Sequence, residues 1–467
     1  MSLIFLFLCN TLLFLLDNSI SLNINFCNSF NINCGLEILF LDWIGLFMLC
    51  VCYFIVLFYS KHYFGGEIDN LNKLILLFVT IMVGLIISNN VLVSLVWWEF
   101  LGVSSFFLIL WYSNFDTSHA GVVTLVSSRF GDVALFFLVG SFFGGGLNIF
   151  LPLLALLVIG SKSASFPLSS WLIEAMRAPT PVSSLVHSST LVAAGVWFLN
   201  NYFSLLNSLS LNVVLLFSLI TITISIINLN FYIDLKKLIA LSTCNNINWC
   251  IVFSILGFSD LAMIQLLVHG ISKCLLFCSV GNQLNANLGN QASYNSTLLF
   301  SQSSNNIFTI NILILIVSGI FFNGIYFSKH ILLCILNGNN NFFICVLLYF
   351  LVLGSYIYSF RLFFLFFNNS NFGLVSGLNS NFYFCNVLIL LGGFSCYYLS
   401  SSLNELTVIN YNCCLLYILM PFLGGFLGYY SSLINSNIAW NSVLFSGLDL
   451  LVTMSYSLIN SISNTIY

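Results

Sequence analysis

The chain has 467 residues, of which 60% are hydrophobic and 5% are charged, and its formal net charge is −3. Soluble globular domains carry about 25% charged residues, so this composition excludes that class of protein. The ten Lys and Arg residues form no patch, which excludes a nucleic-acid partner because phosphate binding needs clustered positive charge.

The chain begins with an apolar segment, Met1 to Leu16, that has neither a preceding Lys or Arg nor a small-residue cleavage site. We therefore predict a retained first helix and no removable signal peptide. An Arg-rich transit peptide is missing as well, and the 49 Phe residues fit an AT-rich organellar genome. These features fit a mitochondrial protein that is made inside the organelle.

Apolar runs of the length that a helix needs to cross a bilayer recur along nearly the whole sequence. Strands of a membrane barrel would alternate apolar and polar residues, and no such alternation persists. We predict an all-α, polytopic transmembrane bundle of about 14 helices. Its parts would be residues 1–90, a charge-bearing core at 91–365, and a C-terminal part at 366–467 that ends in a shortened amphipathic segment.

The first charge inside an apolar stretch is Glu99, which follows Trp97 and Trp98. A carboxylate at that depth costs a few kcal/mol or more, so we expect it to be protonated or paired, either in a structural ion pair or in a proton path. Arg129 and Asp132 are three residues apart, so they share a helix face and form a local pair that is more structural than functional in character.

Lys162 follows Gly160 and Ser161 and precedes Pro167, so we expect its helix to break nearby. A lysine at such a break is a movable charge that water can reach, or else a lysine whose ammonium reaches the membrane surface. Farther on, Pro179-Thr180-Pro181 predicts a rigid turn that starts a helix, with His187 two turns in.

Three charges lie between two apolar runs at Asp234, Lys236 and Lys237. We interpret Asp234 and Lys236 as an interfacial loop cluster, and we expect Lys237 to open the next helix and face inward. His269 and Lys273 are four residues apart on one face of an apolar helix. Both residue types can accept and release protons, so a relay and a structural role both stay open.

Two Ser-Lys dipeptides, Ser161-Lys162 and Ser328-Lys329, each lie where an apolar helix meets a polar or Gly-containing break. Interrupted helices in the two halves of a transporter are a pointer to inverted repeats and to an ion site near the midplane. We therefore predict two inverted repeats, each with a broken helix.

Several of these segments occur in the order of a known family. They are Trp98-Glu99-Phe100-Leu101-Gly102, Arg129-Phe130-Gly131-Asp132, Lys162-Ser163-Ala164, Pro179 to Thr190, Asp234-Leu235-Lys236-Lys237 and His269-Gly270-Ile271-Ser272-Lys273. Over residues 36 to 365 the chain resembles the antiporter-like subunits of respiratory complex I and the related Mrp-type sodium/proton antiporters. Tyr326-Phe327-Ser328-Lys329 resembles the second broken helix of the distal member of that family.

The resemblance implies a proton pathway through the core at 91–365. Glu99 and Lys162 would form a buried pair whose making and breaking changes the proton affinity of the lysine. The remaining pathway residues would be His187, Lys237, His269, Lys273 and Lys329, with Arg129 and Asp132 in support and His330 as a possible member.

The resemblance also implies partners and a compartment. No flavin, iron-sulfur or ubiquinone site would belong to this chain, and the partner subunits would hold those groups. The partners would be other membrane-arm subunits of complex I, above all the neighbouring antiporter-like subunit 4, together with accessory subunits and lipids of the mitochondrial inner membrane. The fifteen cysteines lack zinc-ligand and cluster-ligand spacing, so we expect packing residues and no metal site.

The chain departs from the family pattern at three positions. His330 stands where an acidic residue is usual, Arg177 where mitochondrial relatives often have an acid, and Gln265 where a relay histidine is common. We expect His330 to compensate through hydrogen bonding or water instead of charge. The family's long lateral helix would be represented only by its beginning, Leu444 to Ile466, which we expect to lie along the membrane surface.

Two competing functions stay open at this point. A freestanding or Mrp-type cation/proton antiporter would share the central charges but would need no redox partner. A scaffold that no longer conducts would fit the changes at His330 and Arg177, but it would not explain why Glu99, Lys162, Lys273 and Lys329 are all present.

Overall fold

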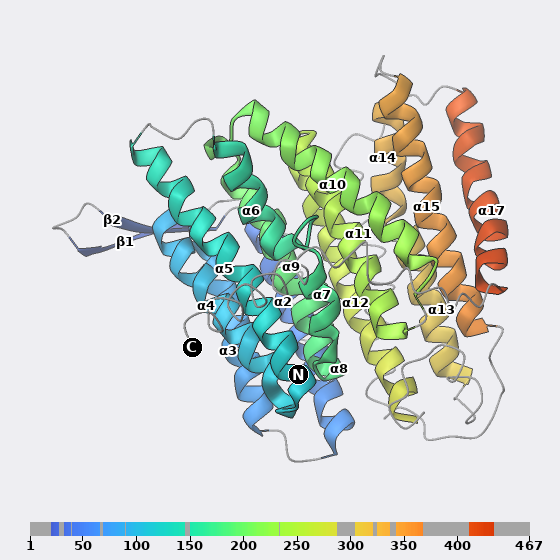
Figure 1. Ribbon diagram of the computed structural model, residues 1–467, viewed down its shortest axis with the longest axis horizontal. Coiled ribbons are helices and arrows are strands. Elements are labelled where there is room, and N and C mark those ends of the chain that lie inside the picture. The colour runs from blue at the N-terminus through green and yellow to red at the C-terminus, as the bar shows by residue number, and fades with distance from the viewer. Residues whose placement is uncertain are drawn as a thin grey trace, which may run out of the picture.

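The chain folds into a bundle of long helices that lie side by side (Figure 1). The computed structural model describes residues 20–27, 32–38, 40–65, 69–88, 90–144, 150–232, 234–286, 304–320, 325–336, 342–367 and 411–433. Within those ranges nine helices are long and apolar enough to cross a membrane, and two shorter apolar helices accompany them. The predicted polytopic helical bundle is therefore confirmed, and the chain is a multi-pass membrane protein.

The first half of the bundle is built from helices that precede and surround the first helix break. In chain order these are α2 (Phe40–Phe64), α3 (Asp69–Ile87), α4 (Val91–Ile109), η1 (Leu110–Tyr112), α5 (Phe115–Gly144), α6 (Leu151–Ser163), α7 (Ser170–Glu174), η2 (Ala175–Arg177), α8 (Thr180–Val182), η3 (Ser183–Thr190) and α9 (Leu191–Asn201). Figure 1 shows α3, α4 and α5 at one side of the bundle, with α6, α7 and α9 nearer its middle.

The second half contains the longest buried helices and the second break. Its elements are η4 (Phe203–Leu205), α10 (Ser208–Leu229), α11 (Leu235–Ile255), α12 (Ser259–Ala286), α13 (Ser304–Ser318), α14 (Tyr326–Leu336), α15 (Phe342–Phe367) and α17 (Tyr411–Leu433). Helices α13, α14, α15 and α17 lie at the opposite side of the bundle from α3 to α5 (Figure 1).

A short hairpin precedes the helices of this predominantly helical bundle. Strand β1 (Ile20–Cys27) pairs with β2 (Ile32–Ile38) in an antiparallel register, with Ile20 opposite Ile38. The sequence of β1 alternates apolar and polar residues from Ile20 to Asn25, which is the period of a strand. The alternation is brief, so it does not stand out against the long apolar runs that follow.

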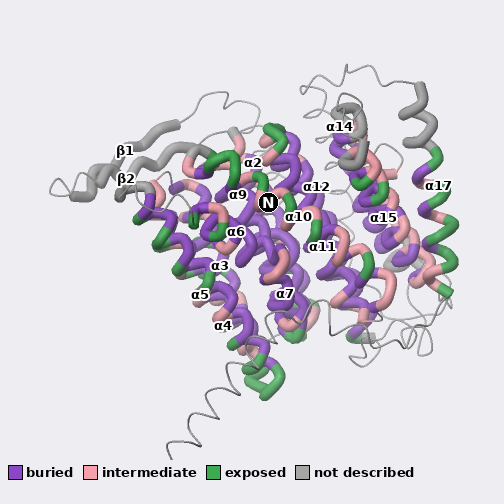
Figure 2. Tube along the Cα trace, turned by 45° about the horizontal axis from the view of Figure 1, so that its top comes forward, coloured by how far each residue is buried: buried purple, intermediate pink, exposed green. Residues whose placement is uncertain are grey.

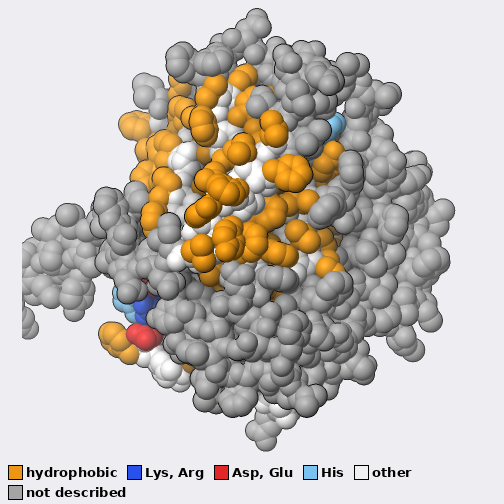
Figure 3. All heavy atoms as spheres, turned by 90° about the vertical axis from the view of Figure 1, so that its right-hand side faces the viewer, with side chains coloured by type: hydrophobic (Ala, Val, Ile, Leu, Met, Phe, Trp, Pro, Cys, Tyr) orange, Lys and Arg blue, Asp and Glu red, His pale blue; other side chains and the backbone are white. Residues whose placement is uncertain are grey.

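Burial is concentrated in the middle of the bundle, where α9, α11 and α12 are almost wholly covered by neighbouring helices (Figure 2). Helices at the edge expose large apolar side chains. On α17 the exposed fractions of Phe422 and Phe426 are 74% and 62%. The described part of the face that includes α17 is mostly hydrophobic (Figure 3). An apolar periphery around a core with polar groups is the arrangement that a bilayer requires.

Two predicted segments lie outside the described residues. They are the first helix at Met1 to Leu16 and the C-terminal segment at Leu444 to Ile466. Their placement, and the division of the chain at residues 90 and 365, stay predictions.

Candidate functional site

The first predicted break is present, and Lys162 lies at it. Helix α6 ends at Ser163, and Ala164 then takes a left-handed conformation with φ of 55°. Lys162 is in the last helical turn with an exposed fraction of 1%, so its ammonium does not reach the membrane surface. The alternative of a surface-reaching lysine is therefore wrong, and the break places a charge inside the protein.

The ammonium of Lys162 contacts an aromatic ring and, among the described residues, forms no ion pair within 4 Å. Its Nζ has no hydrogen-bond partner among the described residues. It lies 5.3 Å from the centre of the Trp98 ring, which makes a cation–π contact. A Cβ placed on Gly102 would be 3.6 Å from the same nitrogen, so α4 approaches Lys162 closely through a residue without a side chain. An unpaired ammonium in such surroundings is costly and responds strongly to nearby charge.

The carboxylates near Lys162 are not arranged as the resemblance implied. Glu99 is paired with Arg129 at 3.9 Å, and its side chain is 37% exposed. Arg129 also pairs with Asp132 at 3.3 Å, and Asp132 is buried. Neighbouring residues on a helix point about 100° apart, so turning Trp98 toward Lys162 carries Glu99 away from it.

The predicted direct pair between Glu99 and Lys162 is therefore replaced by a longer-range arrangement. Arg129 contacts both carboxylates, Glu99 at 3.9 Å and the buried Asp132 at 3.3 Å. Asp132 and Arg129, predicted as a supporting pair, are thus paired with each other, and Arg129 connects them to Glu99.

His187 lies in a distorted helix that follows the predicted proline turn. Pro179 precedes α8, the helix continues as a π-helix over Ser183–Thr190, and α9 follows without a break. The side chain of His187 is fully buried, and neither ring nitrogen has a hydrogen-bond partner among the described residues. The Trp171 ring lies 6.1 Å away. π-helical turns are frequently found at functional sites.

His269 and Lys273 are both buried on α12, on the shared face that their spacing predicted. The Lys273 ammonium donates a hydrogen bond to the hydroxyl of Ser242 on α11. The Nε2 atom of His269 has no partner among the described residues. Two groups that can carry protons are therefore one helical turn apart in the most buried part of the bundle.

The two lysines that open α11 face in the opposite directions from those predicted. Lys237 pairs with Asp234 at 3.1 Å, and both side chains are 36% exposed. Lys236 is buried and donates a hydrogen bond to the carbonyl oxygen of Ala178 at 3.3 Å. The structure thus places Lys237 outside the group of buried ionisable side chains. Lys236 joins that group, and its ammonium lies at the start of the proline turn.

The second predicted break separates α13 from α14, and Lys329 lies just after it. Its ammonium donates a 2.6 Å hydrogen bond to the Ser318 carbonyl oxygen and lies 4.0 Å from the centre of the Tyr356 ring. His330 is half-buried and stacks on Tyr326, with ring centres 5.8 Å apart. Lys162 therefore precedes the first break, whereas Lys329 follows the second.

Helix α11 connects the buried groups with one another. Four of its residues, spanning little more than one turn, each contact a different part of the site. Ser242 contacts Lys273, the Thr243 hydroxyl donates to the His187 carbonyl oxygen (3.5 Å), the Cys244 thiol donates to the Ala164 carbonyl oxygen (3.3 Å), and Asn246 lines a cavity with Lys329. The break at Lys162, the π-helix at His187, Lys273 and Lys329 are thus all adjacent to one buried helix.

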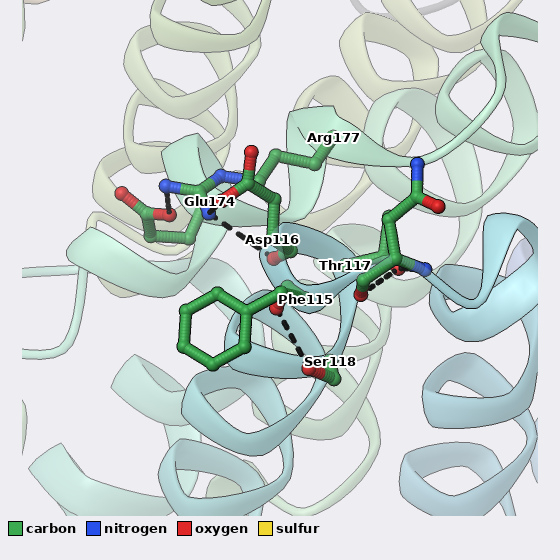
Figure 4. A network of polar contacts seen from close by, with 7 residues as sticks. Phe115, Asp116, Thr117, Ser118, Glu174 and Arg177 are labelled. Atoms are coloured by element: carbon green, nitrogen blue, oxygen red, sulfur yellow. Dashed lines mark hydrogen bonds and ion pairs between the residues drawn. The ribbon is translucent and has the colours of Figure 1, made fainter.

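Arg177, one of the three departures, belongs to a charged cluster with Glu174 and Asp116 (Figure 4). Its guanidinium pairs with Glu174 at 2.8 Å and with Asp116 at 3.3 Å, and it also donates to the Asp116 carbonyl oxygen. These contacts join the start of α5 to the segment between α7 and the proline turn. An arginine at this position therefore has two carboxylate partners within the chain.

Sequence reasoning missed two further buried ionisable groups. Arg361 of α15 donates hydrogen bonds to the carbonyl oxygens of Leu229 and Tyr232, where α10 ends. Asp42 of α2 is fully buried and accepts a hydrogen bond from the Trp197 indole at 3.2 Å. Their occurrence inside apolar runs is the signal that could have found them.

The part of the chain that the structure describes contains no group of three or more His, Cys, Asp or Glu side chains that could hold a metal ion. Its buried lysines and histidines can instead bind and release protons. The arrangement is chemically suited to moving a small cationic species between positions inside the membrane.

Residues 88–355 match the family described as NADH:quinone oxidoreductase/Mrp antiporter, transmembrane. The chain is 32% identical to NADH-ubiquinone oxidoreductase chain 5 of Locusta migratoria, over 96% of this chain and 84% of that one. It is 37% identical to the protein of the same name from Caenorhabditis elegans, over 69% of this chain and 64% of that one.

Solved structures share the fold at low sequence identity. Against respiratory complex I from Thermus thermophilus the TM-score is 0.73 at 15% identity, covering 90% of this chain and 93% of the other. Against the Mrp complex from Dietzia sp. the TM-score is 0.64 at 18% identity, covering 98% of this chain and 59% of the other.

Proposed function

Because this chain belongs to the NADH:quinone oxidoreductase/Mrp antiporter family, we propose that it translocates protons as a non-redox subunit of NADH:ubiquinone oxidoreductase. Its own residues would carry the protons. The energy would come from NADH oxidation and quinone reduction in partner subunits, which would hold the flavin, the iron-sulfur clusters and the ubiquinone.

The observation that carries this proposal is the set of buried ionisable side chains that surround α11. Lys162, His187, Lys273 and Lys329 are each at most 9% exposed, although an uncompensated charge inside a membrane protein is costly. Two of them lie at helix breaks, where backbone irregularity is tolerated because it lines polar space. A scaffold would need none of these charges.

The named relatives favour complex I over a freestanding antiporter. The locust and nematode proteins are both NADH-ubiquinone oxidoreductase chains, and the match to the locust protein extends over nearly the whole of this chain. The Mrp complex shares the fold, at an identity too low to support a shared activity. Because the named relatives are animal NADH-ubiquinone oxidoreductase chains, we place this chain in the mitochondrial inner membrane.

The surface around Glu99 supports a neighbouring membrane-arm subunit as the partner. The Glu99–Arg129 pair lies near the middle of α4 and α5, and both side chains are more than one third exposed. The residues next to them, Phe100 and Phe130, are apolar and about half exposed. A half-exposed ion pair at this depth is unfavourable in lipid, so a protein surface would cover it. We assign that surface to the antiporter-like subunit 4.

Within the chain we assign the proton path to groups along α11. Asp132 would act as the counter-charge that tunes Lys162, with Glu99 acting through Arg129. His187 would connect this part to His269 and Lys273, and Lys329 would be the terminal proton carrier. Lys237 would lie outside the path because it is paired at the surface.

Identifying the proteins that copurify with the chain tests which complex contains it. The chain should be purified in mild detergent, and the proteins that remain bound should be identified by mass spectrometry. Flavoprotein and iron-sulfur subunits are expected in stoichiometric amounts. Recovery with only Mrp-type subunits, or with no partner at all, would contradict the assignment to complex I.

Proton transport itself is tested with Lys273→Met in the assembled complex. Methionine keeps an apolar stem of similar length and removes the titrating group. We expect fewer protons translocated per NADH oxidised in sealed vesicles, with the complex still assembled. Gln283→Met on the same helix is the control and should leave the ratio unchanged. Unchanged pumping in both variants would argue for a structural lysine.

A further inference from the structure

An aromatic ring faces the lysine at each of the two helix breaks. The ammonium of Lys329 lies 4.0 Å from the centre of the Tyr356 ring. The ammonium of Lys162 lies 5.3 Å from the centre of the Trp98 ring. Both distances are within the range of a cation–π contact, and the contact at Lys329 is the closer one. Each ring comes from a continuous helix beside the break, α15 at Lys329 and α4 at Lys162.

The Lys329 ammonium is held by groups that carry no charge. Among the described residues it forms no ion pair within 4 Å. Its hydrogen bond goes to the Ser318 carbonyl oxygen, and its ring contact is with Tyr356. The residues that line the adjacent cavity include no carboxylate. A buried ammonium at this break is therefore stabilised by a carbonyl dipole and an aromatic ring, with no carboxylate in contact.

Helix α17 fixes Tyr356 in place. The two helices α15 and α17 lie side by side (Figure 1), and the Tyr356 side chain is fully buried. A Cβ placed on Gly424 of α17 would lie 2.5 Å from the Tyr356 Cβ and 3.3 Å from the Tyr356 carbonyl carbon. The close approach of α17 thus depends on a residue without a side chain. Tyr356 is packed in advance against α17 while its ring faces the lysine.

We propose that Tyr356 is a positioning residue for proton transfer at Lys329, because its ring stabilises the charged form of this buried lysine in place of a carboxylate. The inference rests on the proposed function. The quadrupole of the ring attracts an ammonium, whereas a neutral amine gains much less from the same contact. The face of the ring takes up no proton, so Lys329 holds a proton inside the membrane without passing it to this neighbour.

A ring and a carboxylate differ in how firmly they hold a charge. Coulomb attraction between opposite unit charges in a poorly polarisable interior is much stronger than a cation–π contact. A carboxylate in contact would therefore hold Lys329 in its charged form, whereas the ring leaves both forms within reach. A proton carrier needs both forms. Loss of a desolvated cation–π contact lowers the ratio of charged to neutral lysine by about ten-fold.

Substitutions at Tyr356 separate the ring from the hydroxyl. Tyr356→Phe keeps the ring and removes the hydroxyl, whereas Tyr356→Leu and Tyr356→Met remove the ring and keep an apolar side chain. The matched control is Phe360→Leu, one turn farther along α15. Phe360 also packs on α17, because a Cβ on Gly425 would lie 3.6 Å from its ring. Among the described residues, Phe360 makes no cation–π contact with a lysine.

Protons translocated per NADH oxidised are measured in sealed vesicles for each variant in the assembled complex, alone and combined with Lys329→Met. We expect Tyr356→Phe and Phe360→Leu to pump as the parent does. Tyr356→Leu and Tyr356→Met should lose most of what Lys329→Met loses. Combined with Lys329→Met, they should lose nothing more, because the ring acts through the ammonium.

The outcomes are distinct. If Lys329→Met pumps fully, the proposed function fails and this inference fails with it. If Lys329→Met is impaired while both ring-free variants pump fully, the role of Tyr356 fails and the proposed function stands. If Tyr356→Leu does not assemble, Tyr356→Met decides, because an unbranched side chain adapts to the space that a ring leaves.

Three further results would overturn the ring contact while leaving the proposed function in place. Equal impairment in Tyr356→Phe and Tyr356→Leu would assign the effect to the hydroxyl. Equal impairment in Phe360→Leu and Tyr356→Leu would assign it to packing against α17. A loss in Tyr356→Leu that adds to the loss in Lys329→Met would show that the ring does not act through the lysine.

Discussion

Lys329, in the first turn of α14, donates a hydrogen bond of 2.6 Å to the carbonyl oxygen of Ser318, the last residue of α13. One ammonium thus joins the two halves of a broken helix. The carbonyl oxygens at a helix C-terminus carry partial negative charge, which favours a cation there. When Lys329 loses its proton, this favourable charge interaction is lost. Its protonation is therefore coupled to the junction between α13 and α14.

We predict that Lys162→Met lowers proton pumping strongly while the complex still assembles. The substitution keeps the apolar stem against Trp98 and removes the titrating group. Lys162→Arg should also impair pumping, because arginine stays protonated at any accessible pH and cannot release a proton. One pKa unit equals about 1.4 kcal/mol, so a change of about a few kcal/mol in the interaction with neighbouring charges carries a lysine between its charged and neutral forms. The measurement is proton uptake per electron pair in sealed vesicles.

A structural lysine would give the reverse pattern in these Lys162 variants. Assembly would then be poor, and whatever complex survived would pump normally. Full pumping by an assembled Lys162→Met complex would remove this residue from the path.

We predict that Gly131→Ala impairs pumping and that Ser161→Gly restores it. A Cβ on Gly131 would overlap the Ser161 side chain, with the two Cβ atoms only 2.7 Å apart. The overlap would push α5 from α6, and with it Asp132 from Lys162. Removing the Ser161 side chain makes room again, so the double variant should approach the parent in proton translocation. If the double variant is as impaired as the single one, the contact between these helices is not the cause.

We predict unequal effects at the two adjacent lysines of α11. Lys237→Met removes a half-exposed ion pair, and such pairs contribute about 0–1 kcal/mol to stability. Lys236→Met removes a buried hydrogen bond to Ala178 at the start of the proline turn, and a bond from a charged donor contributes about 1.5–3 kcal/mol. The thermal stability and yield of the assembled complex should therefore fall more for Lys236→Met. Equal losses of thermal stability in the two variants would show that the hydrogen bond from Lys236 to Ala178 does not stabilise the complex.

We predict that Arg361→Met lowers the yield of assembled complex without changing pumping per surviving complex. The guanidinium connects α15 to the Leu229 and Tyr232 carbonyl oxygens at the end of α10. Its removal should cost on the order of 3 kcal/mol, because two charge-assisted bonds are lost inside the bundle. Arg361→Lys should be intermediate, since one ammonium lacks the planar fork that reaches both acceptors. Reduced pumping at normal yield would instead place Arg361 in the path.

The helix breaks were predictable because their chemistry is local. Gly160 and Pro167 flank Lys162, and a proline removes a backbone donor wherever the helix lies. The proline turn before His187 follows from the same reasoning. The π-helix around His187 left no local signal, because it depends on how η3 packs against α2, α9 and α12. The hairpin at β1 and β2 was missed because its alternation is short.

The direction in which a charged side chain points was less predictable than its presence. Lys236 and Lys237 are adjacent, so a rotation of α11 by about 100° exchanges the buried one and the exposed one. Trp98 and Glu99 are also adjacent, so the same uncertainty about helix rotation led to the incorrect prediction that Glu99 pairs directly with Lys162. Spacing along one helix fixed only relative positions, such as His269 above Lys273. The rotation of each helix is set by tertiary contacts that the sequence does not display.

The partly exposed ion pair of Glu99 and Arg129 affects the stability of a newly made copy of the chain. Before a neighbour arrives, this pair would face hydrocarbon in the middle of the membrane, where each charged residue costs about 2.5–3.5 kcal/mol. A copy without its neighbour would therefore be less stable than an assembled one, and binding would recover the difference. Surplus copies should be short-lived, so the abundance of this chain would follow the supply of its neighbour.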